Sequence, residues 1–139
     1  WARFLLQLDE SPLVESPSWL VEAADGLTRR ALDGGWEVDG RPGLVYTVDW
    51  DGDAVADVRL HWPVCEGIQA AAYLLRRTGD QHWEGWYRRL WDHAARYFID
   101  ENGAWRNELD ENMHQGTQVW PGRPDVYHCT GALTTPLAV

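Results

Sequence analysis

The chain has 139 residues, the size of one domain, and 45% of them are hydrophobic, which is enough for a core. Its net charge of −10, with twelve scattered basic residues, excludes nucleic acid and anionic membranes as partners, because phosphate binding needs clustered cations. We find no signal peptide and no apolar run of about 18 residues, so we expect no membrane attachment. Cys65 and Cys129 lie far apart without metal-ligand spacing, which favours a reducing cytoplasm over a disulfide framework.

The chain opens in a helical pattern. Trp1, Phe4, Leu5 and Leu8 fall at i, i+3, i+4 and i+7, which places them on one helix face. Neither a methionine nor an N-cap residue precedes them. We therefore expect the sequence to begin within a helix and to be the C-terminal part of a larger protein.

A second helix and a hairpin follow. Two Ser-Pro steps in "DESPLVESPSWL" end the first helix, and Ser16 or Ser18 can cap the next one. That helix is expected from Trp19 to the Gly34-Gly35 pair, which suits a C-terminal stop. The stretch "GLVYTVDWDGDAV" is rich in β-branched and aromatic residues and contains Asp-Gly, so it predicts a hairpin between Leu44 and Val58.

Two longer helical patterns come next. The first runs from Trp62 to Arg77, with Pro63 in its first turn and Gly79 after its end. The second runs from Asp80 to about Ile99. Its broad apolar face holds Trp83, Trp86, Tyr87, Leu90, Ala94 and Tyr97, widened by Trp91 and Phe98.

The last part of the chain predicts a strand-and-loop segment around Trp105 and a helix over 126–139 that Pro136 limits. The pattern is therefore mainly α, with helix pairs separated by loops that hold short β-hairpins. This organisation favours a helical toroid in which inner and outer helices alternate and loops at one end build a pocket. A simple bundle stays open as an alternative, although bundles usually have shorter links.

The stretch "RLHWPVCEGIQAA" contains the first candidate site. Trp62 and Glu66 are four residues apart and share a helix face. There the indole offers an apolar surface and the carboxylate accepts hydrogen bonds, so the two side chains can bind a hydroxylated ligand. The alternative is that Glu66 caps the helix or pairs with a neighbouring arginine. His61, directly before Trp62, is either a ligand contact or a loop residue.

The second candidate is His128, which follows the stiff turn "WPGRPDVY" near an expected helix start. The helix dipole there disfavours an imidazolium, so a neutral base stays available for proton abstraction. Asp125 and Tyr127 are close enough in sequence to orient the ring. The alternative is a structural histidine. We expect His82 and His93 to be structural or solvent-exposed, and no HxxxH or HExxH spacing predicts a metal site.

A family resemblance rests on five stretches that occur in order and cover most of the chain from Leu44 to His128. They are "GLVYTVDWDG", "HWPVCEGIQAAAYLLRRTGD", "WYRRLWDHAARYFID", "GAWRNELDEN" and "VWPGRPDVYH". Together they resemble the N-acylglucosamine 2-epimerase superfamily, and within it the mannose isomerase and aldose–ketose isomerase branch. The opening "WARFLLQL" resembles the family helix that begins with PGH-x-x-E-W, with Trp1 as the W.

The resemblance implies an (α/α)6 barrel, of which residues 1–139 are roughly the C-terminal half. It implies an isomerase or 2-epimerase that acts on a small sugar with two histidines and needs neither a metal nor a nicotinamide. His128, which ends the PD-x-YH pattern, is then one catalytic histidine, and the other, in PGH, is expected upstream of Trp1. Substrate-binding roles fall to His61, Trp62 and Glu66 of the HW-x-x-x-E pattern.

The sequence departs from the family on both sides of Glu66, where Cys65 and Gly67 replace common alanines, and we expect this to alter packing more than chemistry. Four functions stay open: a mannose-type aldose–ketose isomerase, a 2-epimerase, an α/α-toroid glycoside hydrolase and a non-catalytic sugar-binding fragment. The hydrolase needs two carboxylates, for which Glu66 and Asp125 are the pair we nominate.

Overall fold

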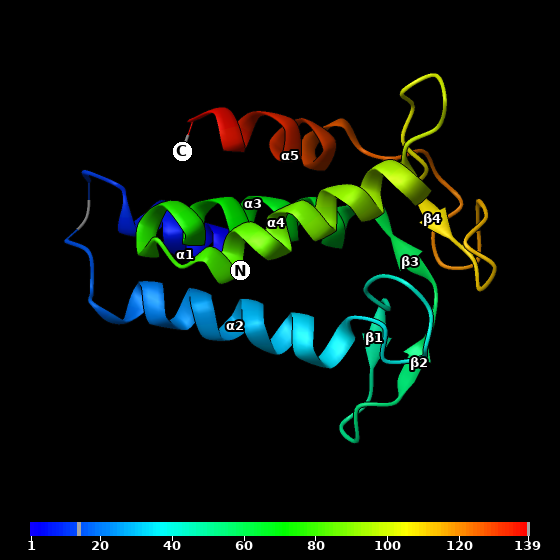
Figure 1. The fold of residues 1–139 in the computed structure, drawn as a ribbon, viewed down its shortest axis with the longest axis horizontal. Helices are drawn as coiled ribbons and strands as arrows, with labels where there is room; N and C mark the ends of the chain where they lie inside the picture. The colour runs from blue at the N-terminus through cyan, green and yellow to red at the C-terminus, as the bar shows by residue number, and fades with distance from the viewer. Residues whose placement is uncertain (14, 139) are drawn as a thin grey trace.

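The computed structural model describes residues 1–13 and 15–138, so Val14 and the expected helical end at Val139 lie outside the described residues. The described chain is mainly helical, and its short strands gather at one end of the helices (Figure 1). The helices are α1 (Ala2–Asp9), α2 (Trp19–Gly35), α3 (His61–Thr78), α4 (Gln81–His93) and α5 (Val126–Ala138), and the π-helix η1 (Ala94–Phe98) continues α4. None of the described helices is long and apolar enough to cross a membrane.

Helix α3 lies at the centre of the fold and packs against α1, α2, α4 and α5. In Figure 1, α2 and α5 lie on opposite sides of the layer that contains α1, α3 and α4. One core cluster fills the space around Ile68, Leu90 and Phe98, and a second surrounds Leu6, Leu74 and Trp83. Both clusters draw on α3, which explains why nine of its residues are buried.

Helix α1 forms where the sequence predicts it, but it buries a different face. Leu6 and Arg3 are buried, whereas Trp1, Phe4 and Leu8 of the predicted apolar face are exposed. Helix α2 spans Trp19–Gly35, as predicted. Ser18 occupies its N-cap position, but the serine side chain makes no capping hydrogen bond.

Two small antiparallel sheets frame the end of the helices where α3 begins. The predicted hairpin is present as β1 (Thr47–Val48) and β2 (Ala54–Ala56). The strand expected near Trp105 is present as β4 (Glu108–Leu109), which pairs with β3 (Arg59–Leu60). Because β3 leads directly into α3, this second sheet fixes the position of the first turn of that helix.

Helices α3 and α4 follow the predicted boundaries closely. Gly79 ends α3 in the left-handed conformation with φ 71°, and Asp80 caps α4 by accepting a hydrogen bond from the backbone N–H of His82. The helix predicted to reach Ile99 changes to the π-helix η1 after His93. Pro136 lies inside α5, which still extends two residues beyond it, because a proline in the last turn removes few helical hydrogen bonds.

Gly67 and Cys65 affect packing, as expected from the sequence. A Cβ atom at Gly67 would lie 3.2 Å from Cδ1 of Leu90, so glycine lets α4 approach α3 closely. The Cys65 side chain is fully buried in the same core cluster as Leu90. Glu66, which lies between these two residues, therefore projects from a tightly packed part of α3.

Candidate active site

The candidate site lies where the N-terminal ends of α3 and α5 meet. Helix α3 carries Trp62 and Glu66, and the first turn of α5 carries His128. The centroids of the Trp62 and His128 rings are 6.0 Å apart, and Nε2 of His128 lies 3.8 Å from Oε1 of Glu66. The structure therefore brings together residues that are more than sixty positions apart and that the sequence selects independently.

Asp125 orients the His128 ring. Nδ1 of His128 lies 2.8 Å and 2.7 Å from the two carboxylate oxygens of Asp125, and the backbone N–H of His128 donates to Oδ1 at 2.8 Å. An ionised carboxylate only accepts hydrogen bonds, so Nδ1 carries the hydrogen and Nε2 of the neutral ring is left as a base. Partial burial opposes ionisation of Asp125, but its hydrogen bonds with His128 outweigh this and lower its pKa.

His61 lies behind this pair, with 2% of its surface exposed. Its Nδ1 contacts the backbone oxygen of Asn107 at 3.3 Å, and its Nε2 lies 3.3 Å from Oδ2 of Asp125 without hydrogen-bond geometry. Burial lowers the pKa of His61 and outweighs the opposing influence of Asn107 and Asp125. A direct contact between His61 and a substrate stays a prediction, because the ring faces Asp125.

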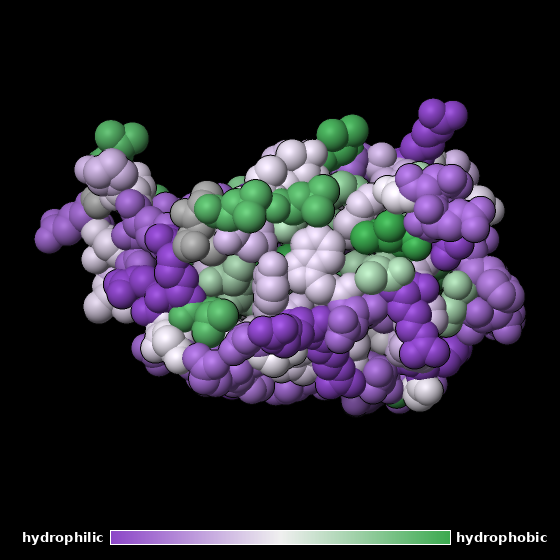
Figure 2. Space-filling view, turned by 45° about the horizontal axis from the view of Figure 1, so that its top comes forward, coloured by the Kyte–Doolittle hydropathy of each residue, from purple (hydrophilic) through white to green (hydrophobic). Residues whose placement is uncertain are grey.

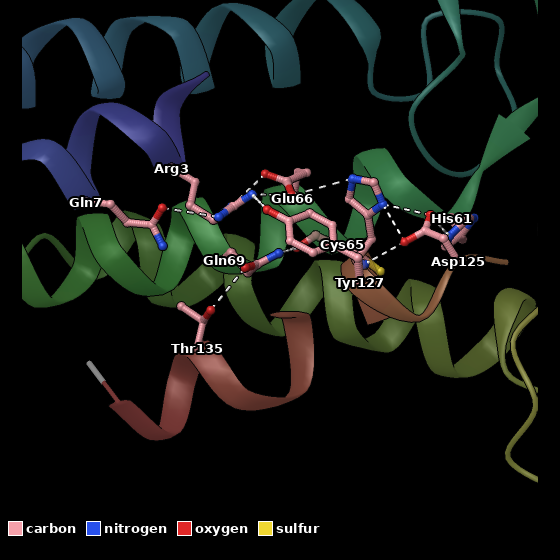
Figure 3. A network of polar contacts seen from close by, with 10 residues as sticks. Arg3, Gln7, His61, Cys65, Glu66, Gln69, Asp125, Tyr127 and Thr135 are labelled. Atoms are coloured by element: carbon pink, nitrogen blue, oxygen red, sulfur yellow. Dashed lines mark hydrogen bonds and ion pairs between the residues drawn. The ribbon is translucent and has the colours of Figure 1, made fainter. Parts of the chain in front are cut away.

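The Arg3 guanidinium pairs with the Glu66 carboxylate (Figure 3). The Arg3 guanidinium donates to both carboxylate oxygens of Glu66, at 2.9 Å and 3.0 Å, and to the Tyr127 hydroxyl at 2.7 Å. Burial disfavours the charge of Arg3, but these partners outweigh it and raise its pKa. The sequence left open whether Glu66 pairs with an arginine. The structure shows this pairing, and the arginine is Arg3 of α1.

A pocket of about 850 Å³ opens beside the Arg3–Glu66 pair and the Trp62 ring. Arg3, Trp62 and Glu66 line it, and Tyr46 of the hairpin segment meets the Trp62 ring edge-on at a centroid distance of 6.4 Å. Most of the other lining side chains come from α2 and from the hairpin. The pocket therefore combines aromatic and apolar walls with the carboxylates of Glu66, Asp33 and Asp51, as a site for a hydroxylated ligand requires.

The stiff turn before His128 is held by a buried carboxylate that sequence reasoning missed. Glu108 of β4 is fully buried and accepts hydrogen bonds from the backbone N–H groups of Gln118, Val119 and Trp120. Asn107 donates to the backbone oxygen of Trp120 at 2.8 Å. These contacts anchor the loop that leads into α5, and the sequence signal for them is the polar pair Asn107-Glu108 at a predicted strand.

His61, Asp125 and His128 together offer donor atoms that lie within 4.8 Å of one another, so they could hold a metal ion. Motif spacing did not reveal this cluster, because sixty-four positions separate His61 from Asp125. The hydrogen bonds between Asp125 and His128 account for the cluster without an ion. The geometry therefore shows Asp125 holding the His128 ring, with His61 beside it.

Residues 1–132 match the family model described as N-acylglucosamine 2-epimerase (GlcNAc 2-epimerase). The chain is 48% identical over 141 residues to the D-mannose isomerase of Thermobifida fusca. It is 45% identical over the same length to the D-mannose isomerase of Pseudomonas cannabina pv. alisalensis. Each match covers 99% of this chain and 34% of the relative, so the chain spans about a third of the length of these curated relatives.

Solved structures show the same fold. A crystal structure of D-mannose isomerase matches with a TM-score of 0.87 at 30% identity, over 99% of this chain and 35% of that one. The cellobiose 2-epimerase of Bacillus thermoamylovorans B4167 matches with a TM-score of 0.73 at 15% identity, over 96% of this chain and 36% of that one. The predicted fold class is confirmed: the chain matches part of an (α/α)6 barrel, with small hairpins between its helices.

Proposed function

Because this chain belongs to the N-acylglucosamine 2-epimerase family, we propose that the intact protein is an aldose–ketose isomerase of the mannose–fructose type. Residues 1–139 then form the C-terminal part of one (α/α)6 barrel, and the second catalytic histidine lies upstream of Trp1. The observation that carries the proposal is the Asp125–His128 pair, whose Nε2 faces Glu66 beside the Trp62 ring.

The proposed reaction is a proton transfer on the open-chain sugar. A hydrogen on the carbon next to a carbonyl is weakly acidic, so its removal needs a positioned base and stabilisation of the enediolate that forms. Nε2 of His128 exchanges a proton with one face of the sugar, and the upstream histidine serves the other face. As the C2–H bond breaks, its electron pair forms the C1–C2 double bond, and the π electrons of the C1 carbonyl move to O1, which takes up a proton. Loss of the proton from the C2 hydroxyl then forms the carbonyl at C2 while C1 accepts a proton, and this yields the ketose.

Glu66 and Trp62 bind the sugar in this proposal. Glu66 accepts hydrogen bonds from hydroxyl groups, and the Trp62 indole, with 39% of its surface exposed, provides an apolar platform in the pocket. His61 acts on this site through Asp125. The proton transfer calls for neither a metal nor a nicotinamide, and two free thiols suit the reducing cytoplasm that we propose as its location.

A 2-epimerase is the second candidate, because return of the proton to C2 from the opposite face would invert that carbon. The family name and the cellobiose 2-epimerase fold support this possibility. Isomerisation is favoured by sequence identity, which is 45% and 48% with two mannose isomerases but 15% with that epimerase.

A glycoside hydrolase is disfavoured by the contacts of the two nominated carboxylates. An inverting or retaining hydrolase needs one carboxyl group that stays protonated as the acid. Asp125 has a lowered pKa and is engaged by His128, and Glu66 is paired with the Arg3 guanidinium. Asp125 is therefore a poor acid, and both oxygens of Glu66 already accept hydrogen bonds from Arg3.

The test is to incubate the intact protein with D-mannose and to identify the product. We expect fructose, and we expect His128→Asn to lower kcat by about 10²–10⁴-fold, the usual contribution of a general acid–base residue. His82→Asn, on the exposed first turn of α4, is the matched control and should keep normal kcat. Glucose as the main product would support the epimerase, and near-normal turnover by His128→Asn would overturn the site assignment.

A further inference from the structure

We infer that Arg3 is a positioning residue that fixes Glu66 and balances its charge, so that His128 remains able to accept a proton. This inference rests on the proposed function and deepens it. Neither the sequence motifs nor the family match assigns a role to Arg3, which lies on α1, more than sixty positions from Glu66. Three observations carry the inference: the geometry of the pair, its burial and its distance from the imidazole.

The geometry joins three helices at one guanidinium. Arg3 of α1 donates two hydrogen bonds to Glu66 of α3 and a third to Tyr127 of α5. Its remaining nitrogen donates to Gln7 Oε1 at 3.2 Å. A two-bond pairing uses one lone pair of each carboxylate oxygen, so Glu66 keeps acceptor sites for sugar hydroxyls.

Arg3 is buried, and its two hydrogen bonds to Glu66 require an arginine. Only 6% of the Arg3 surface is exposed, although the residue lies on a helix whose neighbouring Phe4 is half-exposed. A buried charge is costly unless a partner compensates it, so Arg3 and Glu66 depend on each other. A lysine can supply the charge, but its single ammonium cannot reproduce two parallel hydrogen bonds.

The charge balance matters because Nε2 of His128 lies 3.8 Å from Glu66 Oε1. A carboxylate without its arginine would stabilise the protonated imidazole and would keep the base occupied up to higher pH. The titratable and charged groups around His128 are Asp125 and Tyr127 of its own segment, His61 and Glu66 of α3, and Arg3 of α1. Of these groups only Arg3 carries a fixed positive charge.

The experiment measures kcat/KM of the intact protein against pH for Arg3→Met and Arg3→Lys. In Arg3→Met the pH at which kcat/KM falls to half should rise by about one unit, and KM should rise about tenfold. Arg3→Lys should keep the pH profile of the wild type while raising KM, because it restores the charge without the two-bond geometry. Arg88→Met, which removes an exposed arginine paired with Glu84, is the control and should change neither quantity.

A double variant keeps the test usable if Arg3→Met fails to fold. Arg3→Met combined with Glu66→Gln leaves no uncompensated carboxylate, so it should fold and should show the pH profile of Glu66→Gln alone. A wild-type pH profile in folded Arg3→Met, or an upward shift that persists in the double variant, would overturn the inference. Activity in His128→Asn would instead overturn the proposed function, so the two failures are distinguishable.

Discussion

Asp125 has two roles at the residue scale, and they can be separated. Its Oδ1 accepts the backbone N–H of His128, which caps the first turn of α5, and its carboxylate also accepts Nδ1–H of the His128 ring. The first role needs only an acceptor oxygen. The second depends on the carboxylate, because an amide in the same place can present an N–H and favour the wrong tautomer.

We therefore predict that Asp125→Asn lowers kcat about 10²-fold while leaving the free energy of unfolding nearly unchanged. Asp125→Ala should lose the activity and, in addition, about 1 kcal/mol of stability from the missing cap. Steady-state kinetics and urea unfolding of the intact proteins measure the two effects. Full activity in Asp125→Asn would mean that the carboxylate does not orient His128.

Some residues of the candidate site could be predicted from the sequence, and others could not. His128, Glu66 and Trp62 stand in motifs, so they could be selected before the structure was available. Arg3 could not, because an arginine in the first turn of an amphipathic helix is ordinarily a solvated residue. Its burial follows from tertiary contacts with Glu66 and Tyr127, which no local pattern contains.

At the element scale, the end of α4 depends on a glycine in the loop after α2. Gly43 has φ +92°, and a Cβ atom there would lie 2.4 Å from Cε1 and Nε2 of His93. His93 is buried, and burial, with a smaller contribution from the Arg59 charge, lowers its pKa to about 4. The neutral imidazole therefore packs directly on the Gly43 backbone, and this contact joins α4 to the loop.

We predict that Gly43→Ala lowers the free energy of unfolding by about 2–4 kcal/mol, through overpacking against His93 added to the strain of a positive φ. Gly52→Ala is the matched control, because Gly52 has the same φ of +92° but nothing within 4 Å of its added Cβ. It should cost only the backbone strain, about 1 kcal/mol. Equal losses in urea unfolding would show that the His93 contact contributes nothing.

Most elements could be predicted because each boundary carries its own chemical signal, such as Gly79 after α3 or Asp80 before α4. The π-helix η1 could not, because periodicity does not distinguish it from a continuing α-helix. The buried residues of α1 could not be predicted, since an apolar stripe shows which residues avoid water but not which neighbours exist to cover them.

At the scale of the whole molecule, exposed apolar side chains follow α5. Val126, Leu133 and Leu137 have 78%, 54% and 85% of their surface exposed. Figure 2, which turns the α5 side of the molecule toward the viewer, shows hydrophobic atoms in a line across this face between hydrophilic groups. The proposed (α/α)6 barrel would account for this line if further helices of the intact protein pack against α5.

We predict that Leu133→Glu in the intact protein lowers the free energy of unfolding by about 2–4 kcal/mol, because it would bury an unpaired charge at a helix contact. Val55→Glu, at the exposed position of strand β2, is the comparison and should change stability by about 0.5 kcal/mol or less. Denaturant unfolding of both variants gives the values. A neutral Leu133→Glu would mean that this face of α5 stays in water.

The measurement that tests the central claim most directly follows D-mannose in heavy water by proton NMR, with the intact protein and with His128→Asn. The wild type should produce fructose that carries solvent deuterium at C1, and His128→Asn should leave mannose protonated at C2. Unchanged mannose with the wild type, or fructose formed at a similar rate by His128→Asn, would contradict the assignment of His128 as a proton-transfer residue.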